Sequence, residues 1–196
     1  IEYEQRTDAS WDAYPIELWG LMRQLTNKHL AQLDLSKPNP VFDENGIYQG
    51  IVNYDRLYVG EEQSEFDRNF RKSLGKAANN LEWIDIDSYG PDMYDLDMFS
   101  ADELLNNGGS FVSYYGYDYL GNRLTNQPSF DDFLTKKDKN GNYTRPIAAF
   151  QPIYTAGYIQ DKFAIEDLIF NVGLRVDRYD ANQPVLKDKY LLYDTY

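Results

Sequence analysis

The stretch LIFNVGLRVDRYD, from Leu168 to Asp180, determines how the rest of the chain is interpreted. Apolar residues recur at every second position, and apart from Ile169 the residues between them are polar or glycine. A period of two is typical of a β-strand with one apolar face. The apolar row consists of Leu168, Phe170, Val172, Leu174 and Val176, and the polar row contains Asn171, Arg175 and Asp177.

A second strand-like run, from Ile153 to Phe163, precedes this stretch, and a short acidic link at Glu166 and Asp167 joins the two. We therefore expect two antiparallel strands connected by a tight turn. Each run has about the 9 to 11 residues that a tilted strand needs to cross a bilayer. Residues 151–180 are thus predicted to form a transmembrane β-hairpin, with the apolar row facing lipid and the polar row facing the barrel interior.

The same segment resembles a known family. YIQDKF, from Tyr158 to Phe163, and the stretch from Leu168 to Asp180 are similar to a strand pair of TonB-dependent outer-membrane receptors, in particular the Oar-like group that carries a carboxypeptidase-regulatory-like domain. The opening IEYEQR, from Ile1 to Arg6, is similar to the end of another such strand. The resemblance implies a portion of a transmembrane antiparallel β-barrel in the bacterial outer membrane. It further implies uptake of a large or scarce ligand, such as a peptide, protein, glycan or metal chelate, and contact with TonB through receptor segments that are not in this chain.

This interpretation predicts a mainly β fold with a mixed α+β extracellular insert. Residues 1–6 would end a barrel strand, residues 7–150 would form the insert, and residues 181–196 would begin the next extracellular loop. The insert is too long for a connection without secondary structure of its own. Long loops of outer-membrane barrels lie outside the cell and short turns face the periplasm. Together with the resemblance, this places residues 7–150 outside the cell.

Several helix and strand signals occur within the predicted insert. Pro15 begins a run with helical apolar spacing that continues to His29, and Pro38 and Pro40 are expected to end it and start an irregular stretch. Serines followed three residues later by an acidic residue predict helix starts at Ser64 and Ser100, and Ser129 predicts a further brief helix. Gly108 and Gly109 would end the second of these helices, Asn45 and Gly46 mark a turn, and strands are expected at 51–59 and 111–119.

Composition excludes several classes of function. The net charge of −13 argues against nucleic-acid binding, which requires many Lys or Arg residues against phosphates. The chain has no Cys and no run of about 18 apolar residues, so disulfides, thiol nucleophiles and a transmembrane helix are not expected. The nucleophile-elbow, zinc-protease and phosphate-binding motifs are absent, and the single histidine, His29, fits a packed position better than a catalytic one. We therefore expect no enzymatic activity.

Two clusters are candidates for ligand binding. Tyr114, Tyr115, Tyr117 and Tyr119 can stack against a sugar or a peptide, although ordinary cross-strand packing explains them as well. Asp85, Asp87 and Asp92, followed by Asp95 and Asp97, are candidates for a structural calcium ion, with a solvated acidic loop as the alternative. No other cofactor or metal is expected.

A second function class remains open from the sequence. The chain can instead be a self-contained secreted or surface α+β ligand-binding domain, in which the alternating segments form an ordinary sheet with one solvated face. The row from Leu168 to Val176 would then pack against the helices of the insert. The two interpretations differ in what covers this row.

Overall fold

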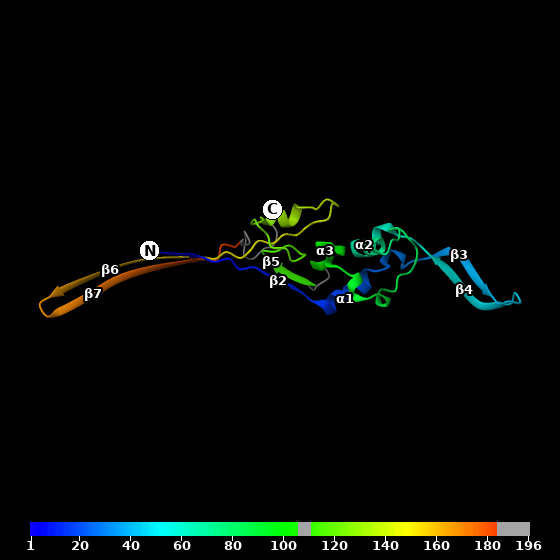
Figure 1. Cartoon of the computed structure of the whole chain (residues 1–196), viewed down its shortest axis with the longest axis horizontal. Coiled ribbons are helices and arrows are strands. Elements are labelled where there is room, and N and C mark those ends of the chain that lie inside the picture. The colour runs from blue at the N-terminus through cyan, green and yellow to red at the C-terminus, as the bar shows by residue number, and fades with distance from the viewer. Residues whose placement is uncertain (106–110, 184–196) are drawn as a thin grey trace, which may run out of the picture. The chain divides into compact units, whose positions relative to one another are not determined.

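The computed structural model describes residues 1–105 and 111–183, which form small antiparallel sheets and short helices (Figure 1). The strands are β1 (Glu2–Gln5), β2 (Ser10–Ala13), β3 (Leu33–Phe42), β4 (Tyr48–Arg56), β5 (Val112–Tyr115), β6 (Ile153–Ile165) and β7 (Leu168–Asp180). The α-helices are α1 (Pro15–Leu25), α2 (Glu65–Ser73), α3 (Ala101–Leu105) and α4 (Phe130–Thr135). The 3₁₀ helices are η1 (Lys28–Leu30), η2 (Gly60–Glu62), η3 (Ile86–Ser88), η4 (Pro91–Met93) and η5 (Leu96–Met98). Gly108, Gly109 and residues 184–196, for which a helix end and a loop were predicted, lie outside the described residues.

The strands belong to three sheets within the described residues. One has the order β1-β6-β7, and the others pair β2 with β5 and β3 with β4. Among the same residues, no helix has both the length and the apolar character that crossing a bilayer requires.

The predicted hairpin is confirmed as a regular antiparallel ladder. β6 and β7 have 13 residues each and pair along their whole length, from Ile165 opposite Leu168 to Ile153 opposite Asp180 (Figure 1). Glu166, in the two-residue turn, adopts a left-handed φ of 52°. β1 adds a third strand along the far end of β6, away from this turn.

The chain divides into two compact units. Among the described residues, the first consists of 1–12, 114–136 and 145–183, and the second consists of 13–105, 111–113 and 137–144. Parts of the predicted insert therefore group with the hairpin. A physical reason is visible beyond the end of the β1–β6 ladder, where the backbone groups of Asp8 and Phe150 exchange hydrogen bonds of 2.8 and 2.9 Å.

The second unit has a hydrophobic core of its own. Its fully buried apolar side chains come from α1, η1, α2, α3 and β5: Leu21, Leu30, Phe66, Phe70, Leu104 and Val112. The ring of Phe66 stacks against Phe99 at 4.4 Å and against Phe70 at 5.8 Å. This packing gives the short helices the tertiary support that helices of their length need.

The predicted helix starts are confirmed. Helix α1 begins at Pro15, where the missing proline N–H has no helical partner to lose. Each predicted serine accepts a hydrogen bond from the backbone N–H three residues later: Ser64 from Asp67 (3.0 Å), Ser100 from Glu103 (3.3 Å) and Ser129 from Asp132 (3.1 Å). These caps satisfy donors that the first helical turn leaves unpaired.

Two predictions before residue 60 were wrong. The helix ends at Leu25 and does not continue to His29, because Asn27 takes a left-handed φ of 61° and redirects the chain into η1. The stretch around Pro38 and Pro40 is not irregular but lies within β3, an edge strand that tolerates the missing proline N–H groups on its unpaired side. The turn at Gly46 is confirmed by its φ of 79°, and β4 occupies Tyr48–Arg56 in place of the predicted 51–59.

The strand predicted at 111–119 is shorter in the structure, where β5 covers only Val112–Tyr115. Gly116 follows with a φ of +71°, a conformation that side chains other than glycine rarely adopt. A Cβ atom there would lie 2.6 Å from the Ala9 Cβ and 2.9 Å from the Ala149 Cβ. The close approach of Ala9 and Ala149 therefore requires glycine at position 116, and the alternation of side chains along β5 ends there.

Candidate functional site

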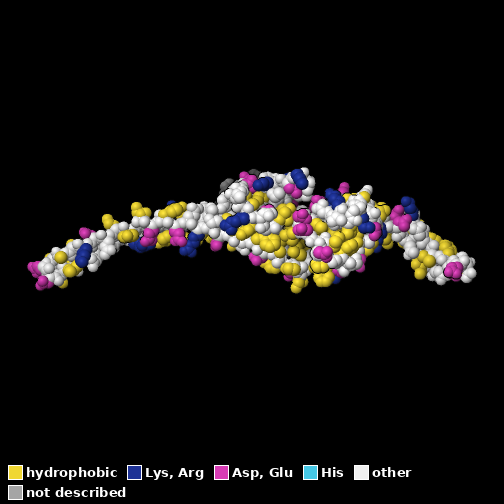
Figure 2. All heavy atoms as spheres, in the orientation of Figure 1, with side chains coloured by type: hydrophobic (Ala, Val, Ile, Leu, Met, Phe, Trp, Pro, Cys, Tyr) yellow, Lys and Arg dark blue, Asp and Glu magenta, His cyan; other side chains and the backbone are white. Residues whose placement is uncertain are grey.

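The β6–β7 hairpin has an exposed apolar face. The register places the predicted row of β7 beside side chains of β6, with Phe170 opposite Phe163 and Leu174 opposite Ile159. The apolar residues of this face are between 40% and 73% exposed: Leu168, Phe170, Val172, Leu174, Val176, Ile159, Phe163 and Ile165. Hydrophobic side chains are visible along the hairpin in Figure 2. Among the described residues, the row from Leu168 to Val176 is therefore exposed and not packed into a core.

The apolar side chains that β6 contributes to this face were not predicted from the sequence. Counting every second residue back from Ile165 gives Phe163, Asp161 and Ile159, so an apolar row with one acidic interruption was available in the pattern. Asp161 lies directly opposite Val172, at the middle of the apolar row of β7. A carboxylate therefore occupies the centre of an otherwise apolar part of the sheet.

The opposite face is polar and tied together by Arg175. Its guanidinium group donates hydrogen bonds to Glu2 (2.8 Å), Asp177 (2.9 Å) and the Tyr154 hydroxyl (2.8 Å). Tyr154 also donates a hydrogen bond to the Asp177 carboxylate. These contacts join β1, β6 and β7. The structure thus brings Arg175 and Asp177 together on one face and places Asn171, opposite Lys162, on the same face nearer the turn.

The four tyrosines of the predicted platform have different surroundings. Tyr114 is 4% exposed, and its hydroxyl donates a hydrogen bond of 2.8 Å to the carbonyl oxygen of Arg145. Tyr115 points to the opposite side of β5 and is exposed. Tyr117 and Tyr119, both half-buried, follow the strand. Tyr114 therefore contributes to packing, and the rings do not form one exposed surface.

The candidate cation site has an ion pair in place of a ligand cluster. The Asp87 carboxylate accepts hydrogen bonds from Trp19 Nε1 (2.8 Å) and Arg23 Nε (2.9 Å), and Arg23 Nη2 lies 2.7 Å from its other oxygen. The hydrogen bond from Arg23 lowers the pKa of the Asp87 carboxyl. Within residues 1–105 and 111–183, no group of three or more His, Cys, Asp or Glu side chains is placed to hold a metal, and Asp85, Asp87 and Asp92 form no such group.

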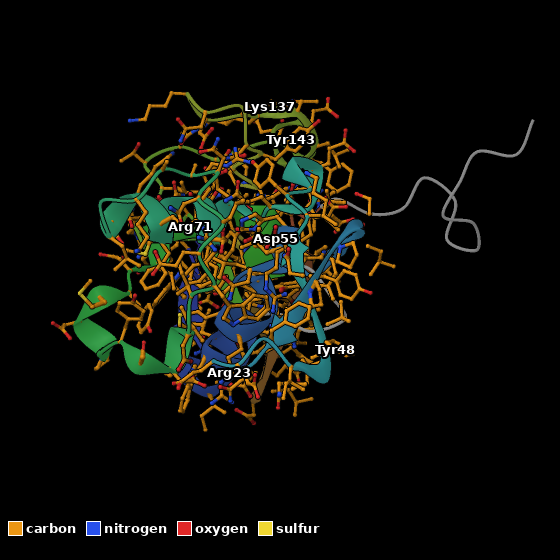
Figure 3. The ribbon with its side chains drawn as sticks, turned by 90° about the vertical axis from the view of Figure 1, so that its right-hand side faces the viewer. Arg23, Tyr48, Asp55, Arg71, Lys137 and Tyr143 are labelled. Atoms are coloured by element: carbon orange, nitrogen blue, oxygen red, sulfur yellow. The ribbon has the colours of Figure 1, made fainter. Side chains whose placement is uncertain are left out.

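A buried polar network, not predicted from the sequence, organises the second unit. Asp67 and Arg71 on α2 are fully buried and joined by a hydrogen bond of 2.8 Å between Arg71 Nε and Asp67 Oδ2. Asp67 also accepts hydrogen bonds from the Asn27 backbone N–H (2.9 Å) and Gln63 Nε2 (2.8 Å). Arg71, labelled in Figure 3, donates further hydrogen bonds to the carbonyl oxygens of Asn80 and Glu82.

A sequence signal for this network did exist. Asp67 and Arg71 are four residues apart and adjoin Phe66 and Phe70, so both lie on the apolar side of α2. Charged residues in such positions are buried only when they are paired.

His29 lies beside this network and is fully buried. Its Nδ1 atom is 3.4 Å from Asp67 Oδ2, and its ring meets the Tyr58 ring edge-on at 5.5 Å. Neither imidazole nitrogen forms a well-aligned hydrogen bond with a described residue. Burial lowers the pKa of His29, the Asp67 carboxylate acts in the opposite direction, and the Arg71 guanidinium adds to the lowering. His29 is therefore neutral in the folded protein near neutral pH.

We expect the stability of the protein to fall as the pH decreases below about 6.5, the ordinary pKa of histidine in an unfolded chain. The unfolded state then binds a proton that buried His29 resists, so the free energy of unfolding decreases by at most about 1.4 kcal/mol per pH unit. Urea unfolding between about pH 7.5 and about pH 5.5 measures this, because His29 is the only histidine of the chain. In His29→Met, the free energy of unfolding should no longer depend on pH over this range. The same pH dependence in His29→Met and in the unmodified chain would contradict the prediction.

Comparison of the chain with protein-family models, curated proteins and solved structures gives no match. The hairpin with its two unlike faces is the feature of the structure that most restricts the function.

Proposed function

We propose that this chain is part of a TonB-dependent outer-membrane receptor that takes up a large or scarce ligand. The observation that supports this most is the β6–β7 hairpin, which exposes a row of apolar side chains on one face and hydrogen-bonded charged side chains on the other. β1 pairs only with Ile153–Ala156, so the rest of the hairpin has two strands, and an isolated two-stranded hairpin is at best marginally stable in water. Lipid on one side and a polar lumen on the other satisfy both faces.

The dimensions of the apolar row agree with this proposal. From Leu168 to Val176 the strand advances eight residues, or about 27 Å at about 3.4 Å per residue. Tilted by about 40°, it covers about 21 Å of membrane thickness, close to the apolar band of about 25 Å on outer-membrane barrels. The two-residue turn after Ile165 suits the periplasmic end of such a hairpin.

The second compact unit suits an extracellular insert. It has its own hydrophobic core and buried polar network, so it does not depend on the hairpin for a folded interior. Three strands cannot close a barrel, since the smallest have about eight. The proposal therefore requires further strands, and the segment that contacts TonB, from other parts of the receptor.

Single cysteines test the proposal directly, because the chain contains none of its own. An environment-sensitive fluorophore is attached at Phe170→Cys or Leu174→Cys on the apolar face, and at Asn171→Cys or Gln160→Cys on the polar face. In the complete receptor reconstituted in liposomes, we expect the apolar-face labels to be quenched by lipids with spin-labelled acyl chains and the polar-face labels by aqueous iodide. Equal access of iodide to both sets would overturn the proposal.

One observation favours a second function, a secreted or surface α+β ligand-binding domain. Asp161 lies on the apolar face opposite Val172, where a charged side chain facing lipid would be destabilising. In this alternative, protein surface covers the face. The cysteine labels on both faces would then give the same signal with and without lipid.

A further inference from the structure

An aromatic groove in the second unit lies between α1 and the loop that contains η3 and η4. Its volume is about 440 Å³, within the range of small-ligand sites. Helix α1 contributes Trp19 and Met22, and the loop contributes Ile86, Tyr89, Pro91 and Tyr94. The walls of the groove are therefore mainly apolar and aromatic, and they come from two segments about 70 residues apart in sequence.

The wall side chains of this groove are held in place by contacts within the second unit. Trp19 Nε1 is held by Asp87, and the Arg23 guanidinium lies 4.6 Å from the centre of the Trp19 ring. Arg23 is labelled in Figure 3. On the other side, the rings of Tyr89 and Tyr94 pack against the buried Phe70 at 5.3 and 5.2 Å. A rigid groove of this kind loses little conformational entropy on binding.

The tryptophan of the groove remains available to a ligand. Trp19 is 49% exposed even with Arg23 against its ring. Its contact with a guanidinium group shows that the surroundings of the ring accept a cation, as cation–π geometry requires.

The charge of the loop beside the groove restricts which ligands the groove can bind. The exposed carboxylates of Asp85, Asp92, Asp95 and Asp97 belong to the same loop. The charge of Asp87 is balanced by Arg23, which leaves this loop with a negative balance. A basic ligand is therefore favoured over a neutral or acidic one. The apolar walls formed by Met22, Ile86 and Pro91 suit aliphatic side chains better than the hydroxyl groups of a sugar.

We propose that this groove binds a short extended peptide whose apolar side chains lie against Trp19 and Tyr94 and whose flanking lysine or arginine side chains face the acidic loop. The proposal holds whether lipid or protein covers the β6–β7 hairpin, so its failure and that of the receptor assignment are separate results.

The test uses the full chain in detergent and a fluorescein-labelled Lys-Leu-Pro-Leu-Lys peptide as the probe, followed by fluorescence anisotropy. We expect saturable binding that weakens as salt increases from about 50 mM to about 500 mM. Trp19→Ala should weaken binding by about tenfold or more, since buried aromatic anchors dominate such interfaces. Asp92→Asn combined with Asp95→Asn, both at exposed positions, should weaken it by about threefold at low salt without affecting the fold.

Trp83→Ala is the matched control. Trp83 is 51% exposed and stacks against Arg56 in the same unit, but it does not line the groove. We expect this variant to bind the peptide within about twofold of the unmodified chain. The proposal is overturned if the basic peptide does not bind up to about 1 mM, if Trp83→Ala and Trp19→Ala lose affinity equally, or if a Glu-Leu-Pro-Leu-Glu peptide or a neutral hexasaccharide displaces the probe.

Discussion

Asp67→Asn is expected to lower the free energy of unfolding by about 3 to 5 kcal/mol, because it leaves the fully buried Arg71 guanidinium without a compensating charge. The asparagine amide also replaces a carboxylate oxygen that accepts hydrogen bonds from Arg71 and Gln63, so donors would face one another. Urea unfolding followed by circular dichroism at neutral pH measures the change.

Arg68→Gln on the same helix is the control for this prediction. Arg68 Nη1 lies 3.6 Å from Glu65 Oε2 and the Arg68 side chain is 41% exposed, so its loss should change stability by less than about 1 kcal/mol. The double variant Asp67→Leu with Arg71→Met should lose less stability than the sum of the two single variants, because it leaves no unpaired charge. Equal losses for Asp67→Asn and Arg68→Gln would show that the buried pair has no special role.

Leu174→Arg is expected to destabilise the membrane-inserted hairpin by about 2 to 4 kcal/mol, if the apolar face meets lipid as proposed. Leu174 is 65% exposed and lies directly opposite Ile159, whereas Asp161 is only its diagonal neighbour, so the guanidinium group would have no carboxylate directly opposite it and would meet mainly apolar side chains and lipid. The measurement is the fraction of the complete receptor that assembles into a heat-modifiable, protease-resistant form in the outer membrane, together with urea unfolding of the receptor in liposomes.

Two further arginine variants make this prediction specific. Gln160→Arg lies at nearly the same height on the polar face, opposite Gly173, and should assemble normally. Val172→Arg lies opposite Asp161, which can pair with the new charge, so its loss should be smaller than that of Leu174→Arg. Normal assembly of Leu174→Arg would contradict a lipid-facing position.

The hairpin and the helix starts could be predicted because their signals are local. The alternation from Leu168 to Val176 depends on the pleat alone, and a serine cap depends on residues three positions apart. β3 could not be predicted in this way, because Pro38 and Pro40 normally indicate a break. They are compatible with a strand only because β3 is an edge strand.

The surroundings of individual side chains were harder to predict because they depend on tertiary contacts. Asp67 was recognised as a residue near a helix start, but its pairing with Arg71 and its contact with Asn27, 40 residues away, require the folded unit. Likewise, the groove exists because η3 and η4 pack near Trp19, and the Asp87 carboxylate that the sequence offered for a cation instead binds Arg23. Ligand binding at the tyrosines remains a prediction.

The paired backbone hydrogen bonds of Asp8 and Phe150 hold two points of the chain side by side that are 142 residues apart in sequence. The residues between Asp8 and Phe150 therefore leave and return at one antiparallel bridge, just beyond the end of the β1–β6 ladder. Segments with neighbouring ends tolerate insertion and replacement well. Evolution or a protein engineer can therefore exchange the intervening residues for another segment while the register of β1 and β6 is preserved.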